Sequence, residues 1–320
     1  MGHQRTTHSG RYWAYHTFGD NYIQGADAYL EKAIGWARTN GLKVVIDCHG
    51  SPGSQNGFDN SGRAGGVEWQ TDDNLNNSIM VLETIAQKYG ASSYADVVYA
   101  IELVNEPISW DQNNFGTTQS WAVDAYNAVK AKATNSDLKV IMHDAFMGPA
   151  DWESIGKTIN GDASKTEAQF AMDVHLYQNQ DDSYDDMNQA QHIVAACNMT
   201  QSYLLPTSAQ LPVFVGEFAA GTNICANPDG TTTAGTTCSV KGCQCGASQS
   251  ITSYSDSLTK ATRQFVEAQL DAFEHSSNGW FIWSYHGPGG WGLDNMVEYG
   301  LIGNPVTERM YPNQCNFTSD

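Results

Sequence analysis

The chain has 320 residues, which suits one large α/β domain or two smaller ones. Its residues are 41% hydrophobic and 11% aromatic, a composition that supports a substantial core and excludes a disordered protein. The 35 acidic and 16 basic residues give a formal net charge of −19. Nucleic acid and anionic membranes are therefore excluded as expected partners, because both repel such a surface. A neutral ligand or acidic surroundings fit this charge.

In chain order, six segments have the apolar, partly β-branched character of buried strands. These predicted strands are 42–48, 97–104, 138–143, 169–175, 211–217 and 279–284. Amphipathic patterns predict helices at 26–39, 73–89, 121–134 and 255–275. Strands that alternate with helices through short loops predict a parallel sheet. We find no repeat and no linker, so the sequence predicts a single domain over residues 1–320.

Polar or aromatic side chains stand at the carboxyl end of every predicted strand. They are Asp47 and His49, Asn105 and Glu106, His143 and Asp144, Asp173 and His175 with Tyr177 beyond, Glu217, and Trp283 with Tyr285. A doubly wound sheet would concentrate such residues at one switch point, whereas a barrel collects them from all its strands. We therefore predict a (β/α)8 TIM barrel with its site on the C-terminal face. No phosphate-binding loop follows a strand, so no cofactor is expected.

The start of the chain fits this barrel incompletely. Only residues 6–15 precede the first predicted helix, and they are a poor strand sequence that is at most the second of eight. We therefore expect a barrel that lacks its first strand and helix, in an N-terminally incomplete chain.

Glu106 and Glu217 end two different predicted strands, which indicates a pair of carboxylates in one site. Glycoside hydrolysis requires such a pair, because one carboxyl protonates the leaving oxygen while the other attacks or activates water. Asn105, beside Glu106, is a candidate donor to the sugar 2-hydroxyl. The alternative for Glu106 alone is a helix cap or a residue in a surface turn.

Other strand-end residues are candidates for binding the sugar. His175 and Tyr177 alternate along one segment and can hydrogen-bond a carboxylate or substrate hydroxyls, and Trp283 offers a flat apolar face to a ring. Satisfied core residues are the alternative for a single histidine or tryptophan. A metal-dependent hydrolase on Asp47, His49, His143 and His175 is a further alternative. The chain has no His-X-His on a first strand, so no metal is expected.

Seven cysteines, four of them in the loop 225–245, favour disulfides in a secreted protein. A zinc site on Cys238, Cys243 and Cys245 is an alternative, but the spacing matches no common finger and no histidine is near. The chain shows no apolar run long enough for a membrane span and no signal peptide. A missing N-terminus would reconcile this with export. Three Asn-X-Ser/Thr sequons agree with secretion, at Asn76, Asn198 and Asn316.

Several motifs, in their order along the chain, resemble one enzyme family. They are IDCHGSPGSQNGFDNSG at 46–62, IELVNEP at 101–107, DVHLYQ at 173–178, VFVGEFAAG at 213–221, RQFVEAQLDAFE and GWFIWSY within 263–285, and YPNQCNF at 311–317. Together they resemble glycoside hydrolase family 5, and within it the fungal exo-β-1,3-glucanase (glucan 1,3-β-glucosidase) group. The resemblance extends from about Trp13 to the end of the chain.

The resemblance implies a retaining glycosidase that releases glucose from the non-reducing ends of β-1,3-glucan through a covalent glycosyl-enzyme. Glu106 would be the acid/base, protonated at rest, and Glu217 the ionised nucleophile, with the two carboxyls about 5 Å apart. In the subsite for the reacting sugar, Asn105 would hold the 2-hydroxyl, Trp283 would form the floor, and the walls would be His49, His175 and Tyr177. The resemblance also implies the disulfide Cys197–Cys315, a bond from Cys225 to Cys243 or Cys245, and a buried free thiol at Cys48.

The chain departs from the group in three places. The group's first strand and helix are absent, and neither Arg5 nor Arg11 aligns with the arginine that supports its nucleophile. His286-Gly287-Pro288 replaces a Lys-Thr-Glu run. These departures leave open another family 5 activity, an endo-β-glucanase or mannanase, and an inactive truncated fragment that at most binds glucan. The expected partner is β-glucan polysaccharide or oligosaccharide, bound by a monomer that is secreted to the cell wall.

Overall fold

The structure is a computed structural model that describes residues 5–199, 203–204 and 211–317. Within these residues one sheet contains six strands, in the order β1 (Arg5–Arg11), β2 (Lys43–Gly50), β3 (Val98–Glu102), β4 (Lys139–His143), β5 (Phe170–His175) and β6 (Val213–Glu217). Strands β1 to β5 pair in parallel. The order follows the chain without a reversal, so the fold is that of a (β/α)8 barrel and not of a doubly wound sheet.

Two compact units divide the chain. Unit 1 comprises residues 1–174 and 207–213, and unit 2 comprises residues 175–206 and 214–320. The boundary crosses β5 and β6, so both strands begin in unit 1 and end in unit 2. Their backbones are joined in each unit, because Met172 N donates to Pro212 O in unit 1 and Leu176 N donates to Glu217 O in unit 2.

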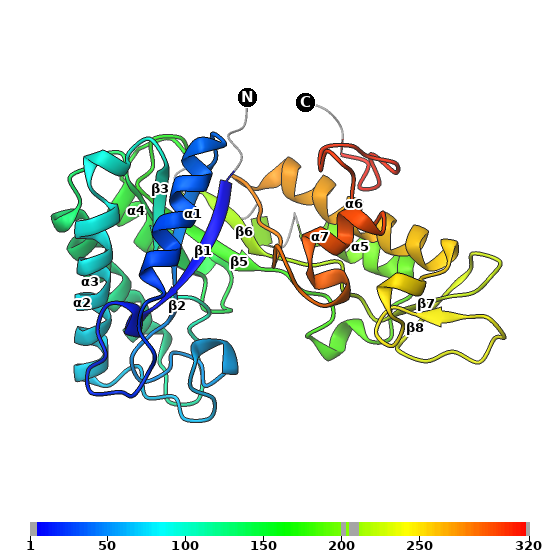
Figure 1. The fold of residues 1–320 in the computed structure, drawn as a ribbon, viewed down its shortest axis with the longest axis horizontal. Helices are drawn as coiled ribbons and strands as arrows, with labels where there is room; N and C mark the ends of the chain where they lie inside the picture. The colour runs from blue at the N-terminus through cyan, green and yellow to red at the C-terminus, as the bar shows by residue number, and fades with distance from the viewer. Residues whose placement is uncertain (1–4, 200–202, 205–210, 318–320) are drawn as a thin grey trace. The chain divides into compact units, whose positions relative to one another are not determined.

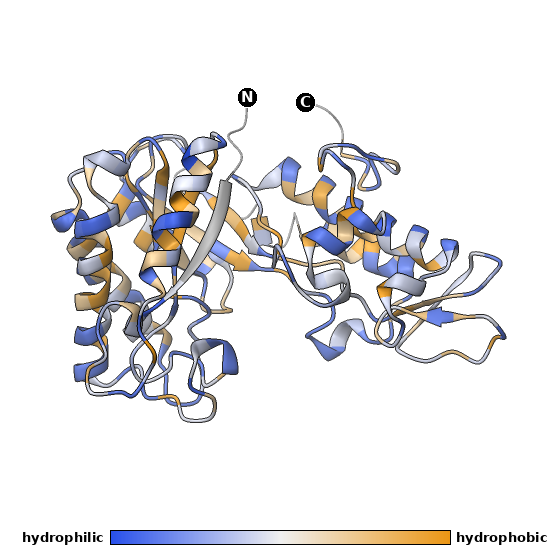
Figure 2. Ribbon diagram, in the orientation of Figure 1, coloured by the Kyte–Doolittle hydropathy of each residue, from blue (hydrophilic) through white to orange (hydrophobic). Residues whose placement is uncertain are grey.

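Helices follow the strands of unit 1. They are α1 (Asp27–Thr39), α2 (Asp72–Tyr89), α3 (Phe115–Lys132) and α4 (Glu153–Asn160). Helix α1 lies along β1 and β2, and α2 lies beside α3 (Figure 1). Strands β2 to β5 are buried almost throughout, as expected for strands covered on both faces. Figure 2 shows the hydrophobic residues of unit 1 concentrated in these strands and on one side of the helices.

Two sequence predictions for unit 1 need correction. Helix α3 begins at Phe115 and not at residue 121, because the Asn114 side chain caps it by accepting from Thr117 N. Residues 6–15 are a poor strand sequence, yet Arg5–Arg11 forms β1. The edge of β2 supplies partners for all seven residues, from Lys43 to Cys48 in register and then Gly50 after a shift that skips His49. Pairing with that edge outweighs weak strand propensity.

Unit 2 combines the ends of β5 and β6 with helices α5 (Gln189–Met199), α6 (Asp256–Ser276) and α7 (Leu293–Glu298). Helices α5 and α6 lie side by side (Figure 1). A small antiparallel sheet, in the order β8-β7-β9, comprises β7 (Ile224–Ala226), β8 (Thr232–Ala234) and β9 (Gln244–Cys245). It fills the Gly- and Thr-rich segment after β6, where the sequence predicted a loop.

The predicted strand at 279–284 is wrong. This segment makes only a parallel bridge between Trp280 and Val215. Phe281 N donates to Val215 O and Trp283 N donates to Phe218 O. The donors are two residues apart and the acceptors three, so the register slips and no regular ladder forms. The segment nevertheless runs along β6, as an additional barrel strand would.

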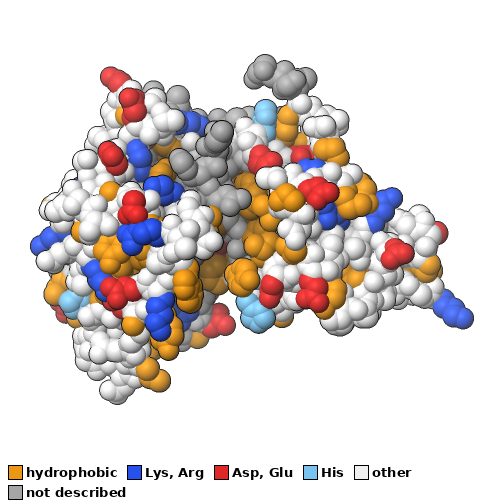
Figure 3. Space-filling view, turned by 45° about the horizontal axis from the view of Figure 1, so that its top comes forward, with side chains coloured by type: hydrophobic (Ala, Val, Ile, Leu, Met, Phe, Trp, Pro, Cys, Tyr) orange, Lys and Arg blue, Asp and Glu red, His pale blue; other side chains and the backbone are white. Residues whose placement is uncertain are grey.

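None of the helices in the described ranges has the length and hydrophobicity that a membrane crossing requires. On the face drawn in Figure 3, acidic and basic side chains are interspersed among uncharged ones. The coloured part of this face therefore presents no single-sign patch of the kind that attracts a charged partner.

Candidate active site

Asn105 and Glu106 follow β3 in unit 1, at the carboxyl end of the strand. Asn105 N donates to Cys48 O of β2 at 3.1 Å, which ties the segment to the neighbouring strand. Glu106 has a φ of 45°, which is uncommon for a residue with a side chain. Such a conformation persists only where the surroundings impose it, and it is typical of functional positions.

A buried glutamine in the loop 50–62 imposes this conformation. Gln55 Nε2 donates to the carbonyl oxygens of His49 and Asn105, each at 2.9 Å, and its Oε1 accepts from Ser51 N at 3.0 Å. Asn56 Nδ2 donates to the carbonyl of Glu106 at 3.1 Å. The loop thereby holds the backbone on both sides of the carboxylate. Sequence analysis singled out the loop but neither residue.

The Glu106 carboxyl has a dedicated donor in the same loop. Asn60 Nδ2 donates to Glu106 Oε2 at 2.6 Å, and Asn60 Oδ1 accepts from Asn56 Nδ2 at 3.1 Å. Because an N–H donor faces it, Oε2 acts as an acceptor in this contact. Asn60 therefore orients the Glu106 carboxyl. The sequence carried no signal for this role beyond the position of Asn60 in the quoted loop.

The side chain of Asn105 is buried, with 1% of the residue exposed. Its Nδ2 makes no hydrogen bond within the described part of the chain. An unpaired buried donor costs free energy, and a binding site is one place where proteins retain one. The contact of Asn105 with a sugar hydroxyl stays a prediction.

His49 lies at the end of β2 and is buried with Asp47. Its Nδ1 is 2.7 Å from Asp47 Oδ2. The carboxylate can only accept a hydrogen bond, so it fixes the orientation of the imidazole ring and places a proton on Nδ1.

Glu217 ends β6 in unit 2 and is buried at the strand's carboxyl end. Tyr177 Oη donates to Glu217 Oε2 at 2.8 Å, and His175 Nδ1 lies 3.5 Å from the same oxygen. A hydroxyl that donates to a carboxylate stabilises negative charge on it. The structure thus brings two of the predicted site residues, His175 and Tyr177, to the carboxylate of a third.

Aromatic residues continue this side of the site. Trp283 is half-buried. Its backbone N donates at 3.0 Å to the carbonyl oxygen of Phe218, the residue that follows Glu217 at the end of β6. The ring of Tyr177 contacts Trp291, with centroids 5.1 Å apart and planes tilted by 42°. The sequence did not indicate Trp291 as a site residue. It did show that the segment His286-Gly287-Pro288, just before it, departs from the family pattern.

The predicted site residues divide between the two units. His49, Asn105 and Glu106 belong to unit 1, whereas His175, Tyr177, Glu217 and Trp283 belong to unit 2. All but Trp283 stand at the carboxyl ends of sheet strands or in the segments just beyond, as the barrel interpretation requires, whereas Trp283 lies in the segment 279–284 outside the regular sheet.

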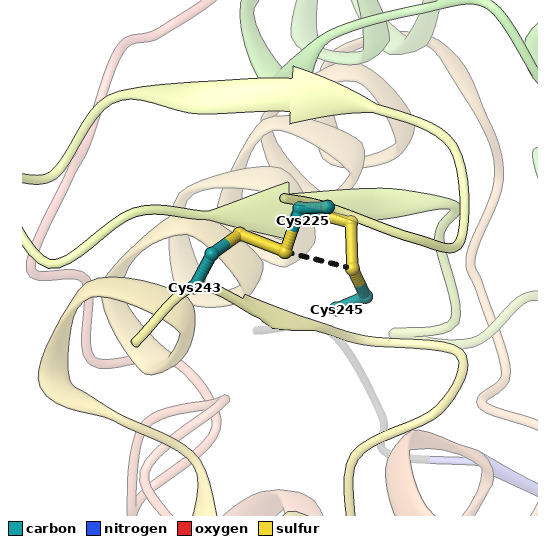
Figure 4. Close-up of side chains that lie close together, drawn as sticks. Cys225, Cys243 and Cys245 are labelled. Carbon is teal, nitrogen blue, oxygen red and sulfur yellow. Dashed lines mark hydrogen bonds between the residues drawn. A yellow bond between two sulfur atoms is a disulfide. The ribbon is translucent and has the colours of Figure 1, made fainter. Parts of the chain in front are cut away.

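Three disulfides account for six of the seven cysteines: Cys197–Cys315, Cys225–Cys245 and Cys238–Cys243. The first agrees with the family-based expectation, and Cys245 is the partner of Cys225 (Figure 4). The four loop sulfurs lie within 4.8 Å of one another, as zinc ligands also do. Paired in disulfides, they provide no thiolate for a metal. Cys48 is free, and burial raises the pKa of its thiol to about 12.

Comparison with known proteins places this geometry in a family. A profile described as cellulase (glycosyl hydrolase family 5) matches residues 9–287. The chain is 34% identical over 321 residues to the probable glucan 1,3-beta-glucosidase A of Emericella nidulans, covering 96% of this chain and 74% of the relative. It is 34% identical over 317 residues to the glucan 1,3-beta-glucosidase of Blumeria graminis, covering 95% and 71%.

A solved structure shares the fold. The rutinosidase from Aspergillus niger superposes with a TM-score of 0.67 at 17% identity, covering 93% of this chain and 78% of that one. The profile match and the two relatives carry the assignment beyond the fold: the chain belongs to glycosyl hydrolase family 5.

Proposed function

We propose that this family 5 chain is an exo-acting glucan 1,3-β-glucosidase, which releases glucose from the non-reducing ends of β-1,3-glucan. The observation that carries the proposal is the strand-end carboxylate Glu217, which accepts a hydrogen bond from Tyr177 at 2.8 Å. The names of the two fungal relatives support the substrate class. The loop 50–62 resembles the loop with which the fungal group closes its cleft into a pocket, and this resemblance favours exo action.

In the proposed mechanism Glu217 attacks the anomeric carbon while Glu106 protonates the departing glycosidic oxygen from Oε1. The first sugar is then bound covalently to Glu217. Glu106 next removes a proton from water, which attacks the same carbon and releases glucose with its original configuration. Because both carboxyls act on one bond, we propose that residues 1–320 work as a single catalytic domain.

Other side chains bind the reacting sugar in this proposal. Asn105 Nδ2 donates to the 2-hydroxyl, a hydrogen bond that strengthens as the oxocarbenium-like transition state forms. His49 and His175 bind further hydroxyls, and Trp283 packs against the apolar face of the ring. The three disulfides support secretion, which would bring a monomeric enzyme to glucan of the cell wall.

The test is product analysis on a soluble β-1,3-glucan, comparing the unmodified chain with Glu217→Gln and Glu106→Gln. Glu298→Gln, an exposed glutamate on α7, is the control. We expect glucose as the only early product, first in its β-anomer by proton NMR. Both site variants should lose activity by about a thousandfold or more, and the control should keep it.

Other outcomes would replace the proposal. Early oligosaccharide products would indicate an endo-acting glucanase. The α-anomer as first product would overturn the retaining mechanism. Binding of glucan without product from any variant would show a glucan-binding protein and not a glycosidase.

A further inference from the structure

Asn60, the donor to Glu106, lies in a single helical turn of the loop 50–62. This 3-10 turn comprises Asp59–Ser61, and Gly62 ends it with a φ of 85°. Gly62 N donates to the carbonyl of Asp59 at 2.9 Å, which closes the turn around Asn60. Because the amide and the glycine belong to one closed turn, the place of Gly62 determines where the Asn60 side chain meets the carboxyl.

Two aromatic side chains from the segment after β1 hold Gly62. Tyr22 Oη donates to the Gly62 carbonyl at 3.1 Å, across 40 positions of the chain. The ring of Trp13 lies so close that a Cβ on Gly62 would come within 2.2 Å of its Cη2 atom. A side chain at this position is thus excluded twice, by the left-handed backbone and by the indole ring.

The two rings brace each other. Trp13 and Tyr22 stack with centroids 4.1 Å apart and planes 11° from parallel. The guanidinium carbon of Arg11 lies over the Trp13 ring, 5.4 Å from its centroid. Tyr12 contacts both rings edge-on, at centroid distances of 5.1 and 5.9 Å. The indole therefore cannot swing away from Gly62 without breaking several aromatic contacts.

These contacts connect three consecutive strands of the sheet. Tyr22 follows β1, Asn60 follows β2 and Glu106 follows β3, and all three belong to unit 1. The hydrogen bond to the Gly62 carbonyl joins the first segment to the second, and the bond from Asn60 to Glu106 Oε2 at 2.6 Å joins the second to the third. The segment after β1 contains none of the predicted site residues, yet it reaches the acid/base candidate through the loop 50–62.

We propose that Trp13 and Tyr22 are positioning residues for the acid/base, which act through Gly62 and Asn60. The role of Glu106 in this inference rests on the proposed function. With the aromatic pair in place, the Asn60 amide stays on the carboxyl and keeps it oriented for proton transfer to the leaving oxygen. Without the pair the turn shifts, and the carboxyl loses part of this orientation.

Two substitutions disturb the contact in different ways. Tyr22→Phe removes the donor but keeps the stacked ring, and Gly62→Ala drives a methyl group into the indole. Tyr29→Phe is the control for the first, since Tyr29 is 71% exposed on α1. Gly66→Ala is the control for the second, because Gly66 is exposed and has open space where a Cβ would stand.

Each variant is assayed on a β-1,3-linked glucose disaccharide, whose leaving oxygen needs a proton, and on a 2,4-dinitrophenyl glucoside, whose leaving group departs without one. On the disaccharide we expect kcat/KM to fall about three- to tenfold in Tyr22→Phe and about tenfold or more in Gly62→Ala. The loss on the dinitrophenyl glucoside should stay below about twofold, and the controls should change neither value. Unchanged values, or equal losses on both substrates, would overturn the proposal.

A double-mutant cycle tests whether the pair acts through Asn60. In the Asn60→Ala background, Tyr22→Phe should lower kcat/KM for the disaccharide by less than about twofold, because the contact that it supports is already lost. A loss that persists in full would show that Tyr22 does not act through Asn60, and would overturn the proposed route.

A measurement on the resting protein separates this inference from the proposed function. In NMR spectra of the chain with isotope-labelled asparagine, the side-chain amide signal of Asn60 is identified by its loss in Asn60→Ala. This signal should move in Glu106→Gln, Tyr22→Phe and Gly62→Ala, and stay in place in both controls. If the unmodified chain hydrolyses neither substrate, the proposed glycosidase activity fails, and this signal alone decides the positioning. An Asn60 signal that Tyr22→Phe and Gly62→Ala leave unmoved would exclude it.

Discussion

Asn60 Nδ2 donates to Glu106 Oε2 at 2.6 Å, so an amide from the loop 50–62 orients the carboxyl that follows β3. The two residues are 46 positions apart in the chain. In the proposed mechanism this contact directs the proton of Glu106 to Oε1 and toward the glycosidic oxygen. Asn60 is then a positioning residue, which acts through the acid/base.

Replacing Asn60 should therefore impair substrates according to their leaving group. We expect Asn60→Ala to lower kcat/KM for a β-1,3-linked glucose disaccharide by about tenfold or more, since acid catalysis as a whole contributes about 10²–10⁴-fold. A glucoside with 2,4-dinitrophenol as leaving group needs no protonation and should lose much less. Asn127→Ala, on an exposed position of α3, is the control. An equal loss on both substrates would indicate a general structural role instead.

Tyr177 should affect the step in which Glu217 attacks. Its hydroxyl donates to the nucleophile, and hydrogen bonds to charged groups contribute about 1.5–3 kcal/mol. Tyr177→Phe keeps the ring beside Trp291 but removes this donor, so the glycosylation rate should fall by about 10–100-fold. The rate of covalent labelling by a 2-deoxy-2-fluoroglucosyl fluoride measures that step directly. Tyr285→Phe, at a residue that is 75% exposed, should label at the original rate.

Acid should destabilise the fold through His192 on α5. This histidine is buried, its Nδ1 lies 2.8 Å from Gln178 Oε1, and burial lowers its pKa from 6.5 to about 4. The folded state therefore keeps it neutral, whereas the unfolded chain takes up a proton below pH 6.5. Stability is lost as the pH falls from 6.5 toward 4, by about 3 kcal/mol from this group.

Urea unfolding at pH 7 and at pH 4.5 measures this loss. In His192→Gln the free energy of unfolding should fall less between pH 7 and pH 4.5, because glutamine does not titrate. His275→Gln, which replaces an exposed histidine at the end of α6, serves as control and should leave the difference unchanged. A pH dependence that survives His192→Gln in full would assign the effect to other groups.

The disulfides should differ in their effect on stability. Cys197–Cys315 closes a loop with a separation of 118 residues, whereas Cys238–Cys243 spans only 5. Longer loops lose more entropy in the unfolded chain when they are closed, and native disulfides contribute about 2–5 kcal/mol. Replacing both cysteines of the long loop by serine should therefore lower the free energy of unfolding more than the same change at Cys238 and Cys243.

Thiol titration of the unreduced, denatured protein checks the pairing itself. One thiol per chain, that of Cys48, should react. Five reactive thiols with one bound zinc per chain would show that the four loop cysteines form a metal site and not two disulfides.

The sequence by itself determined most of the sheet and the chemical class. Strands β2 to β6 begin and end within a few residues of the predicted bounds, because long apolar runs bounded by turns signal buried strands locally. The carboxylates Glu106 and Glu217 follow such runs directly, so their place at the strand ends could be read along the chain. Where local signals were weak the prediction failed: the edge of β2 made residues 5–11 a strand, and a slipped register left residues 279–284 outside the regular sheet.

Tertiary structure alone decided which side chains meet. Gln55 contacts the carbonyl of Asn105 across 50 positions, and Tyr177 contacts Glu217 across 40. The disulfide of Cys225 with Cys245, the hydrogen bond from Asn60 to Glu106 and the contact of Tyr177 with Trp291 are likewise tertiary. Periodicity and turn signals extend over one element, whereas these contacts arise when distant loops converge on the ends of parallel strands. The sequence could therefore name the two carboxylates, and only the fold could supply the side chains that orient them.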